Sequence, residues 1–381
     1  MPASTSRVDV ARRMLLHDRR RLALSLSAMT FTVMIMFMEL GFFNGINDSQ
    51  SRLPPLFNAD LVMMDHRSVH LNKFNRMDRI RLFRALGFEE VTEVIPLYKE
   101  NVGMKNRETK LTKVIFVMAF PPDARPFRNV HLEAVEEELK KQGTVLFDAR
   151  SRDIYGTITR GQEIEINERI FRVGGFVEMG PNFSIDGTIL MSDATWLSNP
   201  WAGSKDRVSY GLIRVRPGTD VQALRRKILE TLPRDIAVLT PDEMRSREVL
   251  YTIKAVPLGA IFGLGMVIGF VIGVIICYQI LYNEITDHLP QYATLRAMGF
   301  SDGYLKHLVV RQALWLSLLG FVPGLLGAFI IYAVIEHFTG ILMFLSAGRV
   351  ALIFFVTVFM CMLAGLIAVK KVTSADPAEL Y

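Results

Sequence analysis

The sequence predicts an α-helical membrane protein with four transmembrane helices and a large α+β extracytoplasmic domain inserted between helices 1 and 2. Three observations lead to this prediction. Half of the 381 residues are hydrophobic and only 22% are charged, which is more apolar surface than one soluble core hides. Four apolar runs are long enough to cross a bilayer. One long polar stretch, residues 47–255, separates the first run from the other three.

The net charge of +6 is concentrated at the amino terminus. The basic residues there are Arg7, Arg12, Arg13, Arg19, Arg20 and Arg21. A nucleic-acid-binding protein gathers its basic residues on a folded domain, so we expect no nucleic acid as partner. Both cysteines, Cys277 and Cys361, lie in apolar runs, so no disulfide is expected to brace the polar domain.

The apolar runs match the roughly 20 residues that a helix needs to cross a bilayer. The first covers residues 22–38 and continues past Glu39 to residue 43. The others cover 256–281, 312–335 and 350–369, and none of these contains a charged residue. The first run exceeds the apolar stretch of a signal peptide and no small-residue cleavage site follows it, so we expect a retained anchor.

Flanking Lys and Arg residues give the orientation, because they resist translocation. The segments before the first span, between the second and third spans and after the fourth are basic, whereas the loop before span four has only Arg349. We therefore expect both termini in the cytoplasm and, in a bacterium, an inner-membrane protein with a periplasmic domain. The expected order is cytoplasmic segment 1–21, transmembrane helix 22–46, external domain 47–255, transmembrane helix 256–281, cytoplasmic segment 282–311, transmembrane helix 312–335, outer loop 336–349, transmembrane helix 350–369 and cytoplasmic tail 370–381.

Two interpretations of the amino-terminal segment stay open. Val8, Ala11, Leu15 and Leu16 recur at helical spacing between arginines. This pattern is typical of a helix lying among lipid headgroups, and equally of a basic flank that only fixes the orientation.

The external domain alternates between strand and helix periodicity, which predicts an α+β fold. The expected strands are 110–120 and 212–215, and the expected helices are 133–141 and 220–232. Residues 163–173 (EIEINERIFRV) alternate, reverse at Asn167-Glu168 and alternate again, which predicts a hairpin that Gly174-Gly175 ends. We expect two subdomains, joined near residues 121–143 and 205–240.

The exit from this domain predicts a long helix. Thr240-Pro241-Asp242-Glu243 fits a capping box with proline at the first helical position. The next breaker, Pro257, already lies in an apolar run, so we expect one helix from 240 to 281, about 60 Å long. The helix of the first span is expected to continue to Pro54. The external domain would then stand on two helical stalks.

Sequence motifs for catalysis are missing. The sequence contains no G-x-x-x-x-G-K-[ST], H-E-x-x-H, Cys-x-x-Cys or G-x-S-x-G, so we expect no catalytic residue, bound cofactor or metal in this chain. Glu39 is an acid near the membrane interior and hence a candidate functional residue. It is also close enough to the interface for its carboxylate to reach water, so we assign it no proton transfer.

A glycine stripe marks span two. Its members fall within an arc of about 160° at 100° per residue; they are Gly259, Gly263, Gly265, Gly269 and Gly273. Small residues let another helix approach closely. The stripe therefore predicts either a dimer or sliding interface, or packing against spans of the same subunit.

The segment between spans two and three predicts a short helix across the inner membrane face. Pro290 can open it, HLPQYATLRAMG runs to a glycine stop at Gly299, and Ser301-Asp302 can cap the next helix. A plain connector does not need this length, so we interpret the segment as a docking surface.

At this segment the chain resembles a known family. Residues 278–305 (YQILYNEITDHLPQYATLRAMGFSDGYL) resemble DevC-type permeases, the membrane subunits of the heterocyst glycolipid class of exporter, within the FtsX and MacB superfamily of ABC transporter permeases. Residues 20–49 resemble the first span of that family. Residues 161–176 (GQEIEINERIFRVGGF) resemble part of its periplasmic insertion, and ADPAEL at 375–380 matches the typical tail.

The resemblance implies a homodimer of non-catalytic subunits with a MacB-like periplasmic domain. A separate DevA-like ATPase subunit would bind ATP and drive export of a lipid or other hydrophobic cargo, with a DevB-like membrane-fusion adaptor and a TolC-like outer-membrane channel. The ATPase subunit would dock on the following residues of this chain: Leu289, Pro290, Gln291, Tyr292, Leu295, Arg296 and Gly299. Two alternatives remain, an FtsX-like signalling subunit that activates a cell-wall hydrolase and a lipoprotein-release permease.

Overall fold

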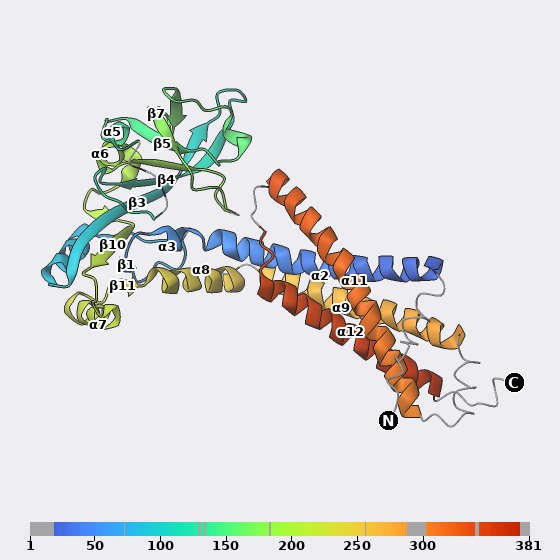
Figure 1. Ribbon diagram of the computed structural model, residues 1–381. Helices are drawn as coiled ribbons and strands as arrows, with labels where there is room; N and C mark the ends of the chain where they lie inside the picture. The colour runs from blue at the N-terminus through green and yellow to red at the C-terminus, as the bar shows by residue number, and fades with distance from the viewer. Residues whose placement is uncertain are drawn as a thin grey trace, which may run out of the picture. The chain divides into compact units, whose positions relative to one another are not determined.

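The chain forms two compact units in the computed structural model (Figure 1). The helical unit comprises Met1–Gly45 and Pro257–Tyr381, and the αβ unit comprises Ile46–Val256. The structure describes residues 19–71, 73–128, 130, 132, 135–182, 184–255, 257–287, 302–339 and 343–373.

Four long helices make up the described part of the helical unit: α2 (Arg19–Gln50), α9 (Leu258–Asp287), α11 (Asp302–Thr339) and α12 (Ala347–Thr373). All four are long and apolar enough to cross a membrane, which confirms the four predicted spans. Their buried faces share one apolar cluster that includes Met29, Val33, Leu316 and Met360. The amino-terminal apolar positions Val8 to Leu16 lie outside the described residues.

The expected helix from 240 to 281 is interrupted, and that prediction is wrong. Helix α8 (Pro241–Ala255) ends two residues before Pro257, and α9 begins at Leu258. Proline has no amide hydrogen to donate and disfavours helical backbone at the residue before it. The break therefore falls where the sequence places its only proline between 242 and 289. In contrast, α2 runs without interruption for 32 residues and ends four residues before Pro54.

The αβ unit is built on a nine-stranded sheet in the order β11-β1-β10-β3-β4-β8-β5-β7-β6. Strand β6 also pairs with β3, so six of these strands close into a barrel, in the order β3-β4-β8-β5-β7-β6. The strands are β1 (Leu61–Asp65), β3 (Val91–Lys105), β4 (Thr112–Phe120), β5 (Thr144–Asp148), β6 (Glu163–Ile166), β7 (Arg169–Val177), β8 (Thr188–Ser192), β10 (Tyr210–Val215) and β11 (Ile236–Leu239), and β2 (Met77–Asp78) pairs separately with β9 (Arg207–Val208).

Short helices connect these strands. They are α3 (Leu53–Leu56), α4 (Arg79–Arg84), α5 (Glu136–Leu139), α6 (Asp193–Leu197) and α7 (Val221–Thr231), with 3₁₀ turns η1 (Ala85–Gly87), η3 (Asp153–Tyr155) and η4 (Pro200–Ala202). The expected helix at 220–232 is confirmed as α7, with Asp220 as its N-cap and Leu224 and Ile228 buried. The helix expected at 133–141 is only four residues long where it is described.

Strand β3 is common to both parts of the sheet. Its first half pairs with β10 up to Leu97, opposite Tyr210, and its second half pairs with β4 from Tyr98, opposite Ala119. The chain thus enters the barrel within one 15-residue strand. The junction expected near 121–143 is therefore wrong, because those residues lie between two barrel strands, β4 and β5.

The hairpin expected at 163–173 is confirmed as β6 and β7, with Asn167 and Glu168 at positive φ in the turn. Strand β7 does not end at Gly174-Gly175 but continues to Val177. A Cβ at Gly174 would lie 2.5 Å from Thr144 Cγ2, and one at Gly175 would lie 2.7 Å from Val135 Cγ1. These glycines permit close packing on the strand rather than a turn.

Candidate functional site

Three glycines of the predicted stripe contact helices of the same chain. A Cβ at Gly265 would lie 2.5 Å from the Glu39 carboxyl carbon, and one at Gly269 would lie 3.4 Å from Ile35 Cγ2. A Cβ at Gly273 would lie 2.6 Å from Thr32 Cγ2 and would overlap the Met360 sulfur. At these positions, side chains of α2 and α12 pack directly against the backbone of α9.

Gly263 does not share this packing. No atom lies within 4 Å of a Cβ built at Gly263, and Gly259 is half-buried. Apolar side chains on the same helix, such as Ile261, Leu264 and Ile268, are about half exposed or more. The stripe thus combines intrachain contacts at Gly265, Gly269 and Gly273 with an open face at Gly263.

A second glycine stripe was not found in the sequence analysis. Cβ atoms at Gly320, Gly324 and Gly327 of α11 would lie 2.6–2.7 Å from Met29, Val33 and Met34 of α2. The small-x-x-x-small spacing of Gly320 and Gly324 is the sequence signal that could have identified this face. Further along α11, Tyr332 donates a hydrogen bond to the Phe37 carbonyl. Helix α2 therefore packs against glycines from two helices.

The predicted ATPase-docking residues lie outside the described residues. Helix α9 ends at Asp287 and α11 begins at Asp302, so Leu289, Pro290, Gln291, Tyr292, Leu295, Arg296 and Gly299 fall between them. Arg349 is described, and its guanidinium donates to the Phe344 carbonyl at 2.9 Å. Within the described ranges, no three His, Cys, Asp or Glu side chains are grouped to hold a metal ion.

Helix α8 is fixed at its start by the expected capping box. The Thr240 hydroxyl accepts from Glu243 N at 3.2 Å, and the Glu243 carboxylate accepts from Thr240 N at 2.9 Å. Arg225 on α7 donates to both oxygens of that carboxylate, at 2.7 and 2.9 Å. The capping residues thus also join α8 to the neighbouring helix.

Further along α8, Arg245 lies 3.9 Å from the Asp48 carboxylate and hydrogen-bonds Ser51 at 3.5 Å. Both partners are in the segment that ends α2 and follows it. Because these residues all belong to the αβ unit, the two chain segments that enter and leave this unit are joined to each other.

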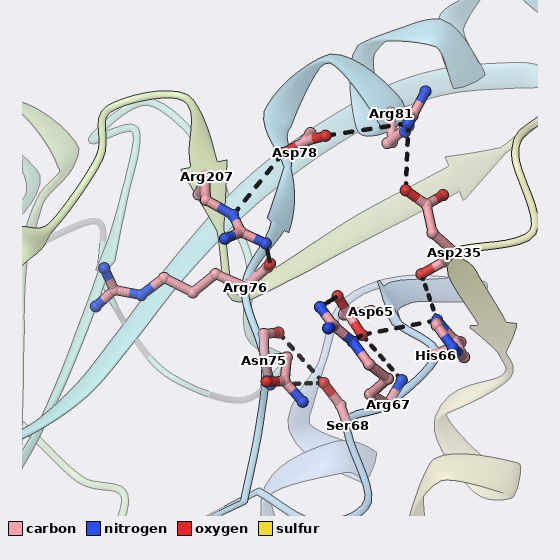
Figure 2. Close-up of polar contacts among 10 residues, drawn as sticks. All are labelled: Asp65, His66, Arg67, Ser68, Asn75, Arg76, Asp78, Arg81, Arg207 and Asp235. Atoms are coloured by element: carbon pink, nitrogen blue, oxygen red, sulfur yellow. Dashed lines mark hydrogen bonds and ion pairs between the residues drawn. The ribbon is translucent and has the colours of Figure 1, made fainter.

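The β1–β2 loop, residues 66–76, is held by a polar network (Figure 2). The buried carboxylate of Asp65 accepts three hydrogen bonds from Arg67, at 2.9–3.0 Å. The side-chain hydrogen bond from Arg67 holds the pKa of Asp65 below its ordinary value. Ser68 and Asn75 close the loop through two hydrogen bonds, at 2.9 and 3.2 Å.

The same loop is joined to its surroundings, as Figure 2 shows. His66 Nδ1 lies 3.0 Å from the carbonyl of Asp235, just before β11. Arg81 of α4 forms an ion pair with Asp235 at 3.2 Å. The loop is therefore tied, through Asp235, to α4 and to the start of β11.

Two protein-family models match the chain. The model of the FtsX-like permease C-terminal domain matches residues 251–377, and the model of the MacB-like periplasmic core domain matches residues 22–231. Comparison with curated protein sequences gives no match.

Solved structures similar to part of the chain include the periplasmic region of MacB from Actinobacillus actinomycetemcomitans (11% identity, TM-score 0.37, 50% of this chain and 92% of that one). Another is the extracellular domain of the noncanonic ABC-type transporter YknZ from Gram-positive bacteria (9% identity, TM-score 0.33, 48% of this chain and 99% of that one). A third is a domain of a permease protein from Porphyromonas gingivalis (17% identity, TM-score 0.32, 48% of this chain and 90% of that one).

The four apolar helices and the α+β unit between the first and second define a membrane protein with an extracytoplasmic domain. The chain belongs to the FtsX/MacB-like family of ABC transporter permeases. Members of this family are permease components of ABC transporters, whose ATPase is generally a separate subunit.

Proposed function

We propose that this chain is the permease of a DevC-type exporter in a bacterial inner membrane, with both termini in the cytoplasm. Two copies form the permease, and a separate ATPase subunit docks on residues 289–299. Motion driven by ATP passes to the extracytoplasmic domain. A membrane-fusion adaptor and an outer-membrane channel complete the path for a lipid or other hydrophobic cargo.

The continuous helix α2 is the observation that carries this proposal. Its 32 residues give a length of about 48 Å, which exceeds a hydrocarbon core of about 30 Å. Its last residues, from Ile46, already belong to the αβ unit. A rigid rod of this kind can transmit displacement without any catalytic group in the chain.

The glycine contacts of α2 support the same proposal. The glycines of α9 and α11 that contact α2 have no side chains that could interlock with those of α2. Smooth helix surfaces can slide or rotate at less steric cost than interdigitated ones. The open face of α9 near Gly263 supports the homodimer, because small-residue faces are where membrane helices associate.

The test is a pair of aspartate substitutions in the docking segment. Leu295→Asp with Arg296→Asp should abolish co-purification of the ATPase subunit with the tagged full-length chain from its native membrane. The matched control, Lys306→Asp with His307→Asp, introduces the same charges at exposed positions of α11 and should retain the subunit. Equal recovery of ATPase with both pairs would contradict the docking assignment.

The proteins recovered with the chain also distinguish its alternatives. A membrane-fusion adaptor in the purified complex supports export. A cell-wall hydrolase without an adaptor supports a signalling permease instead, and acylated proteins bound to the chain support lipoprotein release.

A further inference from the structure

Three ionisable side chains are buried where α8 meets the β1–β2 loop. They are Glu248 on α8, His70 in the loop and Lys99 in β3, with exposed fractions of 3%, 7% and 1%. A buried charge is costly unless it is paired and hydrogen-bonded. Apolar residues would fill these positions at lower cost, so the contacts of the three side chains need an explanation.

Glu248 joins α8 to the loop. Its Oε2 atom accepts a hydrogen bond from Leu71 N at 3.0 Å and lies 3.1 Å from His70 Nε2. The His70 ring packs on Tyr251, with ring centroids 4.8 Å apart. Arg247 adds a hydrogen bond to the Ser68 carbonyl. Several polar contacts therefore fasten one stretch of α8 to the loop.

Lys99 continues the connection from the loop to β3. Its ammonium donates to the Leu71 carbonyl and lies 4.3 Å and 4.9 Å from the ring centroids of Phe74 and Phe116. The peptide groups of Leu71 are thus held from both sides, the amide by Glu248 and the carbonyl by Lys99. Lys99 pairs with Met118 of β4, two residues beyond the last residue that pairs with β10.

We propose that Glu248 and Lys99 are positioning residues that pass a displacement of α8 through Leu71 to the middle of β3. We call this connection the Glu248–Leu71–Lys99 relay. It reaches β3 at the point where this strand leaves the four-stranded part of the sheet and enters the barrel. A shift at that point moves the barrel relative to the four-stranded part. The relay rests on the proposed function, because α8 must move during the ATP cycle.

Titration gives the relay a signature that simple packing lacks. Burial raises the pKa of Glu248 to about 7 and lowers the pKa of Lys99 to about 7. Burial also lowers the pKa of His70 to about 4, so its imidazole is neutral near pH 7. The other charged or titratable groups facing these three are Lys73, Glu100, Tyr210, Arg247 and Tyr251.

Titration of Glu248 weakens the relay below pH 7, and titration of Lys99 weakens it above pH 7. Below pH 7, Glu248 takes up a proton and becomes a weaker acceptor for Leu71 N. Above pH 7, Lys99 loses the charge that holds it to the Leu71 carbonyl and to two aromatic rings. Transmission should therefore have a bell-shaped pH profile centred near pH 7.

The test uses the full chain in lipid nanodiscs with its ATPase subunit and a non-hydrolysable ATP analogue, so no cargo is needed. A fluorophore at Lys254→Cys, exposed on α8, reports movement of the helix. Spin labels at Lys113→Cys on β4 and Arg226→Cys on α7, both exposed, report the barrel against the four-stranded part. The native cysteines are buried and so react slowly with the labels.

The relay is removed by Lys99→Met with Glu248→Met, which leaves neither a donor nor an acceptor for Leu71 and no lone buried charge. The population that shifts its spin-label distance on nucleotide binding should fall about fivefold or more. Glu248→Gln alone should remove the acid limb of the pH profile, and Lys99→Met alone the alkaline limb. The matched control, Lys105→Met with Asp242→Asn, removes the same charges from β3 and α8 outside the relay and should leave the shift unchanged.

The outcomes separate the relay from the proposed function. If the fluorophore at Lys254→Cys responds to nucleotide but the spin-label distance shifts equally in the relay and control variants, the relay alone is overturned. The same holds if the fluorophore responds and the spin-label distance does not shift in any variant. No nucleotide response at Lys254→Cys in the otherwise wild-type complex overturns the proposed function, and the relay with it. Thermal unfolding of each variant shows whether a lost shift comes from a lost fold, and a relay pair that unfolds like the control but lacks the shift supports the relay.

Discussion

Replacing Gly273 by leucine tests whether the glycines of α9 pack against their own subunit. A Cβ at this position would lie 2.6 Å from Thr32 Cγ2 and would overlap Met360. Neither neighbour has open space to move into, since Thr32 is 1% exposed and Met360 is fully buried. The three further carbons of leucine would have to displace α2 or α12.

Overpacking of a well-packed site costs typically about 1–3 kcal/mol. We expect Gly273→Leu to lie at the upper end of this range, because Met360 belongs to the apolar cluster of the helical unit and Thr32 is also buried. Gly263→Leu is the matched control on the same helix, since nothing lies within 4 Å of an added Cβ there. It should change the free energy of unfolding by less than about 0.5 kcal/mol.

The purified full-length chain is denatured in mixed micelles, and the rate at which the buried cysteines become reactive measures its unfolding. Cys277 and Cys361 are buried in the helical unit and so report its opening directly. Equal loss of stability in both variants, or in neither, would refute intrachain packing at Gly273. If Gly263→Leu leaves unfolding unchanged but abolishes cross-linking between copies, the open face of α9 is the dimer interface.

Three further predictions concern the αβ unit. Asp148→Ala should destabilise the unit by at least about 3 kcal/mol in thermal unfolding, because the buried carboxylate accepts from Arg150 N, Met179 N and Gly180 N at 2.8–3.1 Å; an equal effect of the exposed Asp153→Ala would contradict this reasoning. Thr240→Ala should cost about 1 kcal/mol by removing the N-cap of α8 and should speed hydrogen exchange in its first turn, whereas unchanged exchange would argue against the capping box. The pKa of Lys99 is lowered from 10.5 to about 7, so wild-type stability should rise from pH 7 to pH 10 by up to about 4 kcal/mol, and urea titrations of Lys99→Met should lose this slope.

The membrane spans and several local elements were predictable because their causes are local. A bilayer requires a run of apolar residues of fixed length, and the four runs are visible without knowing what they contact. The capping box at Thr240 and the hairpin at Asn167 depend on residues within a few positions of each other. The interruption at Pro257 was also readable from the sequence, since proline lacks the amide that a continuous helix needs.

The relay residues gave no usable signal in the sequence. Lys99 and Glu248 each lie beside another charged residue, Glu100 and Arg247, so both resemble ordinary surface positions. Their burial follows from the β1–β2 loop, which covers them and has no periodicity of its own. The small-x-x-x-small spacing of Gly320 and Gly324 indicates a close helix contact, but only the structure shows that α2 is the helix that packs there.

The amino-acid sequence alone determined which segments cross the membrane, where a few local elements such as α7, α8 and the β6–β7 hairpin lie, and that the chain lacks the motifs of an ATPase. The tertiary structure decided that six strands close into a barrel through pairing of β3 with β6, and that a lysine and a glutamate 149 positions apart hold the carbonyl and the amide of the same residue, Leu71. Periodicity reports which face of an element is buried, whereas its partner depends on contacts between residues far apart in the chain.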